Sequence, residues 1–153
     1  MPERHITVQR RMSASPGALW ALFADFPNLA NHWSGLRATR PIGDQTGGVG
    51  ARRHVELKPI GSMDETVTTW EERRRIGTRN HPSASVPFKH AESMLTLEPD
   101  QDGTLATFDY RYLPRGGALG RLTGPLIDKM LTANFADMLL ATDEAALRSG
   151  TER

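Results

Sequence analysis

The feature that most constrains the fold of this chain is a change in hydrophobic pattern along it, from a strand-like alternation in the middle to a helical spacing near the end. In the middle of the chain, apolar and polar residues alternate as in half-buried strands over about six consecutive segments, at 36–40, 51–58, 63–72, 74–80, 90–98 and 104–112. From 118 to 148, apolar residues instead recur at spacings of three and four, which is typical of an amphipathic helix. A run of strands followed by one helix predicts an α+β fold, in which the helix covers one face of an antiparallel sheet.

The N-terminal region predicts a strand and two short helices before this sheet. Apolar residues share one face of the segment 5–13, as in a strand with one buried face. Ser15 and Pro16 are the residue types preferred at a helix N-cap and at the first helical position. This helix is expected to end before Pro27, and a second short helical turn is expected at 28–33.

The long C-terminal helix leaves one question open. Gly124 and Pro125 interrupt its pattern, so either the helix kinks there or a short turn precedes a helix that begins near Pro125. A helix of about 24 residues would be about 36 Å long and could cross a whole curved sheet. A cavity between such a sheet and the helix is a typical place for a small ligand to bind.

Composition excludes several classes of protein. The 153 residues include no cysteine, which excludes disulfides, thiolate metal sites and cysteine nucleophiles. Because 19 Lys and Arg balance 18 Asp and Glu, binding to nucleic acid through overall positive charge is not expected. The 5 histidines show no dense metal-ligand spacing, so neither a metal nor another cofactor is expected. The length favours a single domain over residues 1–153.

Two further patterns concern location. No run of about 18 apolar residues occurs, so a membrane span is not expected. Residues 1–12 lack the apolar core of a secretory signal. We therefore expect the protein in the cytoplasm.

Several short stretches, in their order and spacing, resemble one known family. They are Ser-Pro-Gly-Ala-Leu-Trp at 15–20, Ala-Asp-Phe-Pro at 24–27 with His-Trp at 32–33, the strand pair 65–78, Leu-Glu-Pro at 97–99 with Asp-Gly-Thr at 102–104, and Leu-Gly-Arg-Leu at 119–122 with Pro-Leu at 125–126. In this combination the chain resembles the START/Bet v 1-like (SRPBCC) superfamily, specifically its polyketide cyclase/dehydrase group, from Ile6 to about Leu147.

The resemblance implies a fold and a broad function. The fold is the helix-grip fold, a curved antiparallel sheet of about six to seven strands wrapped on a long C-terminal helix, with two short helices after the first strand. The shared functional feature is a hydrophobic cavity. Members of the superfamily include cyclases, dehydratases, lipid and quinone carriers and hormone receptors, and no universal catalytic motif can be carried over to this chain.

Strand parity predicts which side chains face the cavity, because successive side chains alternate between the two faces of a strand. Parity, the apolar stripe of the helix and proximity to the cavity mouth together predict the lining residues Trp33, Arg53, Val55, Leu57, Val67, Leu95, Phe108, Tyr110, Tyr112, Ile127, Met130, Leu131, Asn134 and Met138. His54 has the opposite parity and is expected on the solvent face. Trp70 also differs in parity from Val67, and its side is left open because a β-bulge would reverse it.

The candidates for a general acid or base in this cavity are His32, Glu65, Tyr110 and Tyr112, which form no pair recognisable from the sequence. The tyrosines either present their hydroxyls to the cavity or carry them at its rim. His32 either contacts a ligand or is a capping or exposed residue.

Two other polar residues also have alternative roles. Asn134 either orients a ligand carbonyl or bonds to a neighbouring backbone group. Arg53 pairs with a ligand carboxylate or with a glutamate of the next strand, or it extends to solvent at the sheet edge.

Three functions are consistent with these patterns. The leading hypothesis is binding of a hydrophobic small molecule, such as a lipid, a quinone or a polyketide-like aromatic, in the cavity. The second is a cyclase or dehydratase-type enzyme that acts in the same cavity. The third is an interaction module or homodimer without a ligand.

Overall fold

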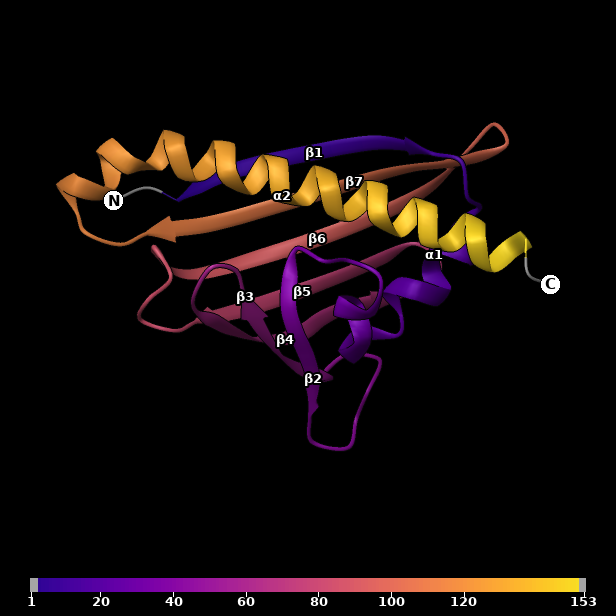
Figure 1. Cartoon of the computed structure of the whole chain (residues 1–153), viewed down its shortest axis with the longest axis horizontal. Helices are drawn as coiled ribbons and strands as arrows, with labels where there is room; N and C mark the ends of the chain where they lie inside the picture. Colours follow the sequence, from indigo (N-terminus) through magenta and orange to yellow (C-terminus); the bar gives the residue numbers. More distant parts are fainter. Residues whose placement is uncertain (1–2, 152–153) are drawn as a thin grey trace.

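A single seven-stranded antiparallel sheet and one long helix make up most of the computed structural model, which describes residues 3–151 (Figure 1). Residues 1–2 and 152–153, the ends of the expected domain, lie outside the described residues. The elements in chain order are β1 (Arg4–Met12), α1 (Pro16–Phe23), the 3-10 helix η1 (Phe26–Asn31), β2 (Leu36–Ile42), β3 (Arg52–Leu57), β4 (Ser62–Glu71), β5 (Arg75–Pro82), β6 (Phe88–Asp100), β7 (Gly103–Pro114) and α2 (Ala118–Thr151).

The sheet has the order β1-β7-β6-β5-β4-β3-β2, so β1 is an edge strand and pairs with the last strand. All other strands pair with their neighbours in sequence, as the Asp-Gly turn and the other short connections favour. Figure 1 shows α2 lying along β1 and β7, with α1 near its C-terminal half. The predicted helix-grip fold, with two short helices after the first strand, is confirmed.

Helix α2 is longer than expected and is continuous through Pro125. It spans 34 residues, so the alternative of a separate turn before Pro125 is wrong. The missing amide of a proline removes only one hydrogen bond of the helix ladder, and Pro125 lies on an exposed part of α2.

The N-terminal half of α2 rests on the sheet through a narrow face. Gly124 allows this close approach, because a Cβ at this position would lie 2.7 Å from Nη1 of Arg4. The opposite face of the helix carries Leu119, Leu122 and Leu126, which are 66%, 80% and 69% exposed although they belong to the apolar pattern.

A β-bulge in β4 settles the side of Trp70. The pairing of β4 with β5 shifts register between Val67 and Thr69, which reverses the alternation beyond this point. The indole of Trp70 therefore turns to the core and contacts Trp20 edge-on, with ring centroids 5.1 Å apart.

Two contacts fix the end of the molecule where β1 enters α1. Ser15 caps α1, as predicted, by accepting a hydrogen bond from the amide of Ala18 at 3.2 Å. The buried carboxylate of Asp143 on α2 accepts hydrogen bonds from the amides of Ser13 and Ala14, at 3.0 and 2.9 Å. These hydrogen bonds attach the C-terminal half of α2 to the β1–α1 turn.

Candidate functional site

A cavity of about 270 Å³ lies between the concave face of the sheet and the middle of α2. Of the residues expected to line it, the structure places eleven around this cavity: Trp33, Arg53, Val55, Leu57, Leu95, Phe108, Tyr110, Met130, Leu131, Asn134 and Met138. Strand alternation explains most of these positions, because the residues from β3, β6 and β7 all lie on the face towards α2.

Three of the expected lining residues lie elsewhere. Val67 packs in a small separate cluster with Phe26 and Ala51, next to the bulge of β4. Ile127 is buried in the main core but does not border the cavity. Tyr112 is also buried, and its hydroxyl is engaged by α2.

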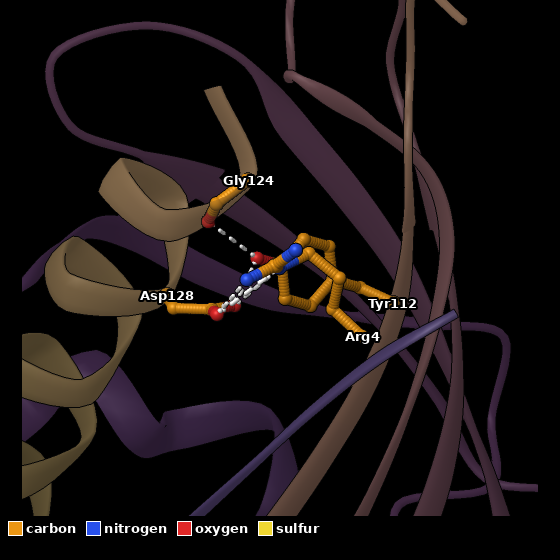
Figure 2. A network of polar contacts seen from close by, with 4 residues as sticks. All are labelled: Arg4, Tyr112, Gly124 and Asp128. Atoms are coloured by element: carbon orange, nitrogen blue, oxygen red, sulfur yellow. Dashed lines mark hydrogen bonds and ion pairs between the residues drawn. The ribbon is translucent and has the colours of Figure 1, made fainter. Parts of the chain in front are cut away.

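Tyr112 belongs to a polar network that connects β1, β7 and α2 (Figure 2). Arg4 donates from Nε and Nη2 to Oδ2 of Asp128, at 3.0 and 2.6 Å. The hydroxyl of Tyr112 donates to Oδ1 of Asp128 and lies 3.3 Å from the carbonyl oxygen of Gly124. The hydrogen bond from Arg4 lowers the pKa of Asp128, and burial raises the pKa of Tyr112. Each polar side chain of this network has a partner, so the network holds the helix to the sheet.

Arg53 and Glu65 form a buried ion pair at the wall of the cavity. Nε and Nη2 of Arg53 lie 2.7 and 2.6 Å from Oε1 of Glu65. Nη1 donates to the carbonyl oxygen of Phe26 at 2.8 Å, and the guanidinium lies 3.8 Å from the centre of the Phe26 ring. Of the alternatives for Arg53, the structure shows the pair with a glutamate of the next strand.

Tyr110 presents its hydroxyl to the cavity side of the sheet. The side chain is fully enclosed, and the hydroxyl contacts the sulfur of Met63 at 3.8 Å. Burial raises the pKa of Tyr110, and the negative charge of Glu65 raises it further, while a polar interaction with the Asn80 side chain, outside normal hydrogen-bond geometry, lowers it. The phenol therefore stays protonated and can donate a hydrogen bond to a ligand.

His32 does not reach the cavity. Its Nε2 lies 3.2 Å from Oγ1 of Thr142, so the ring connects the end of η1 to α2. Burial lowers the pKa of His32, which favours the neutral imidazole. Among the described residues, no histidine lines the cavity. His54, expected on the solvent face, pairs with Asp64 at 2.7 Å between Nδ1 and Oδ1.

The predicted lining did not include five polar residues that border the cavity: Lys58, Thr78, Asn80, Ser85 and Ser93. Thr78 and Asn80 lie on the same face of β5 as the buried Ile76, because the three residues are spaced by two. The parity argument could therefore have found them. The hydroxyls of Thr78 and Ser93 lie 2.5 Å apart and satisfy each other. In contrast, neither Nδ2 nor Oδ1 of Asn80 has a hydrogen-bond partner within residues 3–151.

The described residues contain neither a metal site nor a membrane-spanning helix. Within residues 3–151, no group of three or more His, Asp or Glu side chains is arranged to hold a metal ion. The helices of the same residues include none with the length and apolar character that a bilayer span requires.

Comparison with known proteins agrees with this architecture. The family model described as polyketide cyclase / dehydrase and lipid transport matches residues 3–146. No curated protein sequence matches the chain.

Solved structures similar to this one include an aromatase/cyclase, Zhui, from Streptomyces sp. R1128, at a TM-score of 0.78 and 16% identity over 96% of this chain and 95% of that chain. A START superfamily protein from Mycobacterium smegmatis has a TM-score of 0.77 and 13% identity, over 94% of this chain and 97% of that chain. The protein Ara h 8.0201 has a TM-score of 0.73 and 10% identity, over 96% of this chain and 99% of that chain. Identities this low show a shared fold alone.

Proposed function

Because the chain belongs to the polyketide cyclase/dehydrase and lipid transport family, as its sequence resemblance predicted, we propose that residues 1–153 form one domain that binds a hydrophobic small molecule. The ligand class is a lipid, a quinone or a polyketide-like compound, and the site is the cavity between the sheet and α2. The single observation that carries this proposal is the cavity of about 270 Å³, lined mainly by apolar side chains.

The size and opening of the cavity support a small ligand, or a larger one that is partly enclosed. Small-molecule sites in proteins typically measure about 300–1,000 Å³, so this cavity is at the lower end. Its lining includes Ile60, Met130 and Asn134, which are also exposed and so mark an opening to solvent. An apolar chain or ring longer than the cavity would extend past these residues.

Native mass spectrometry of the purified protein tests the proposal, because a bound apolar molecule adds its mass to the folded chain. Titration with a fluorescent naphthalene dye then measures the affinity. Leu95→Trp places an indole in the cavity and is expected to weaken dye binding at least about tenfold. The matched control is Thr96→Trp at the adjacent position on the other face of β6, which should bind as the unmodified protein does. Equal binding by both variants would contradict a site in this cavity.

A cyclase or dehydratase-type enzyme is the second candidate, favoured by Glu65 and Tyr110 on the wall of one cavity. Loss of water requires a proton donor and a proton acceptor near the same substrate. The protonated phenol of Tyr110 suits the first role, whereas Arg53 already binds the carboxylate of Glu65. Incubation with a linear poly-β-ketone, followed by mass spectrometry, distinguishes the functions. A product lighter by one water, lost in Glu65→Gln, would favour the enzyme over a carrier.

A homodimer is a third candidate, supported by the exposed Leu119, Leu122 and Leu126 of α2. Size-exclusion chromatography with light scattering separates a monomer of 16.9 kDa from a dimer of twice that mass. The cytoplasmic location stays a prediction, which fractionation of cells that produce the protein would test.

A further inference from the structure

The buried amide of Asn80 is the least satisfied polar group that borders the cavity. Its side chain is 1% exposed, and neither Nδ2 nor Oδ1 has a hydrogen-bond partner among the described residues. An unpaired buried amide costs free energy, so such groups are rare in folded proteins unless something else binds them. Asn80 lines the cavity, where a ligand would supply the missing partners.

On the sheet, Asn80 lies between Glu65 of β4, whose carboxylate binds Arg53, and Ala91 of β6. On the ladder between β5 and β6, Thr78 is opposite Ser93, and their hydroxyls bond to each other at 2.5 Å. Two residues further along the same face, Asn80 is opposite Ala91, whose side chain can neither donate nor accept. The cavity wall therefore has one satisfied polar pair and, next to it, one amide whose donor and acceptor make no hydrogen bond of normal geometry among the described residues.

The groups around Asn80 define the charge of a suitable partner. The phenol of Tyr110 interacts with the Asn80 side chain outside normal hydrogen-bond geometry, and its hydroxyl donates only to the weak sulfur acceptor of Met63. The carboxylate of Glu65 acts on the same phenol and disfavours a second negative charge beside it. Arg53 is not placed to bind a ligand carboxylate, because its Nε, Nη1 and Nη2 already bind Glu65 and a main-chain carbonyl. A neutral head group fits these surroundings, and a carboxylate does not.

We propose that Asn80 and Tyr110 form a polar subsite of the cavity, which binds a neutral carbonyl group that carries an N–H donor on the same carbon or a hydroxyl donor on the next carbon. The Asn80 Nδ2 and the Tyr110 hydroxyl donate to the ligand carbonyl, and the Asn80 Oδ1 accepts from the ligand donor. Carboxamides, lactams and α-hydroxyketones with an apolar body belong to this class. The inference rests on the proposed function, because it names the head group of the molecule that the cavity binds.

A series of naphthalene probes of nearly equal size tests the subsite. Naphthalene-2-carboxamide offers a carbonyl and a donor, 2-methylnaphthalene offers neither, and 2-naphthoate at pH 8 is anionic. We expect the unmodified protein to bind the carboxamide about 10- to 100-fold more tightly than the other two, measured by calorimetry or dye displacement. Asn80→Leu should remove this preference and leave 2-methylnaphthalene binding within about twofold.

Two tyrosine variants make the test independent of the Asn80 substitution. Tyr110→Phe should reduce the preference for the carboxamide several-fold. Tyr112→Phe is the matched control: it also removes a tyrosine hydroxyl from β7, but one outside the cavity, and should leave the preference unchanged. Binding of 2-methylnaphthalene without any preference for the carboxamide would overturn the subsite alone. Failure of all three probes to bind would overturn the proposed function together with the subsite. A preference that survives in both Asn80→Leu and Tyr110→Phe would also overturn the subsite.

Discussion

Tyr110 and Tyr112 are two residues apart on the same face of β7, but their hydroxyls have different partners. The hydroxyl of Tyr112 binds the carboxylate of Asp128, which Arg4 also binds (Figure 2). Tyr110 borders the cavity, and the one hydrogen bond that its hydroxyl makes among the described residues is the weak one to the sulfur of Met63. One tyrosine therefore helps to hold α2 on the sheet, and the other keeps its hydrogen-bonding capacity for a ligand.

The same difference extends to the polar groups around each tyrosine. Near Tyr112, an ion pair and a main-chain carbonyl satisfy every polar side chain. Near Tyr110, the Asn80 amide has no partner within residues 3–151. Substitutions in the first region should therefore change stability, and substitutions in the second should change ligand binding.

The largest effect is expected for Asp128→Ala. The substitution leaves the Arg4 guanidinium and the Tyr112 hydroxyl without their main acceptor, and the free energy of unfolding should fall by about 2–3 kcal/mol in urea denaturation. Affinity for an apolar probe should not change, since Asp128 does not line the cavity. A loss of stability below about 0.5 kcal/mol would contradict the role of the network.

The variants Tyr110→Phe and Tyr112→Phe should differ in their free energy of unfolding. Tyr112→Phe removes a hydrogen bond to a carboxylate and should lower the free energy of unfolding by about 1–2 kcal/mol. Tyr110→Phe removes only a weak sulfur contact and should lower it by less than about 0.5 kcal/mol. Equal losses in parallel urea denaturations would remove the distinction between the two regions.

Asn80→Leu should stabilise the protein without ligand. The substitution replaces a buried amide that lacks a hydrogen bond with an apolar group of similar shape. The free energy of unfolding should therefore rise by about 1 kcal/mol. Thermal unfolding followed by circular dichroism checks this prediction. A clear loss of stability would show that the amide has a partner in the folded protein.

The smallest effect concerns acid. Since the folded-state pKa of Asp128 is lowered, mainly by the hydrogen bond from Arg4, its contribution to stability is complete above its ordinary pKa of 3.8 and is lost as the pH falls through the lower folded-state value. The stability difference between the unmodified protein and Asp128→Asn should therefore shrink below about pH 4. A constant difference down to about pH 2 would contradict this contribution.

The fold was predictable because it depends on local periodicity. The alternation of β1 and β7 and the spacing in α2 predicted a sheet with a covering helix, and the Ser15 cap was visible as a residue type. The same alternation places Arg53 and Tyr110 at the cavity. The bulge that turns Trp70 inward was not predictable, because it depends on the register between two strands.

The polar partners could not be predicted either. Arg4 and Asp128 are far apart in sequence and meet only because β1 lies beside α2. That Asn80 has no hydrogen bond of normal geometry depends on its neighbours in two other strands, Ala91 and the Arg53-bound Glu65, and no pattern within β5 contains this information.

Nuclear magnetic resonance of the Asn80 side chain tests the central claim most directly. The claim is that the cavity binds an apolar molecule whose carbonyl meets this amide. In a proton–nitrogen correlation spectrum, addition of naphthalene-2-carboxamide should shift the Asn80 side-chain amide signals, while 2-methylnaphthalene should shift only the backbone amide signals of the apolar lining residues. Unchanged Asn80 signals at saturating carboxamide would contradict the account.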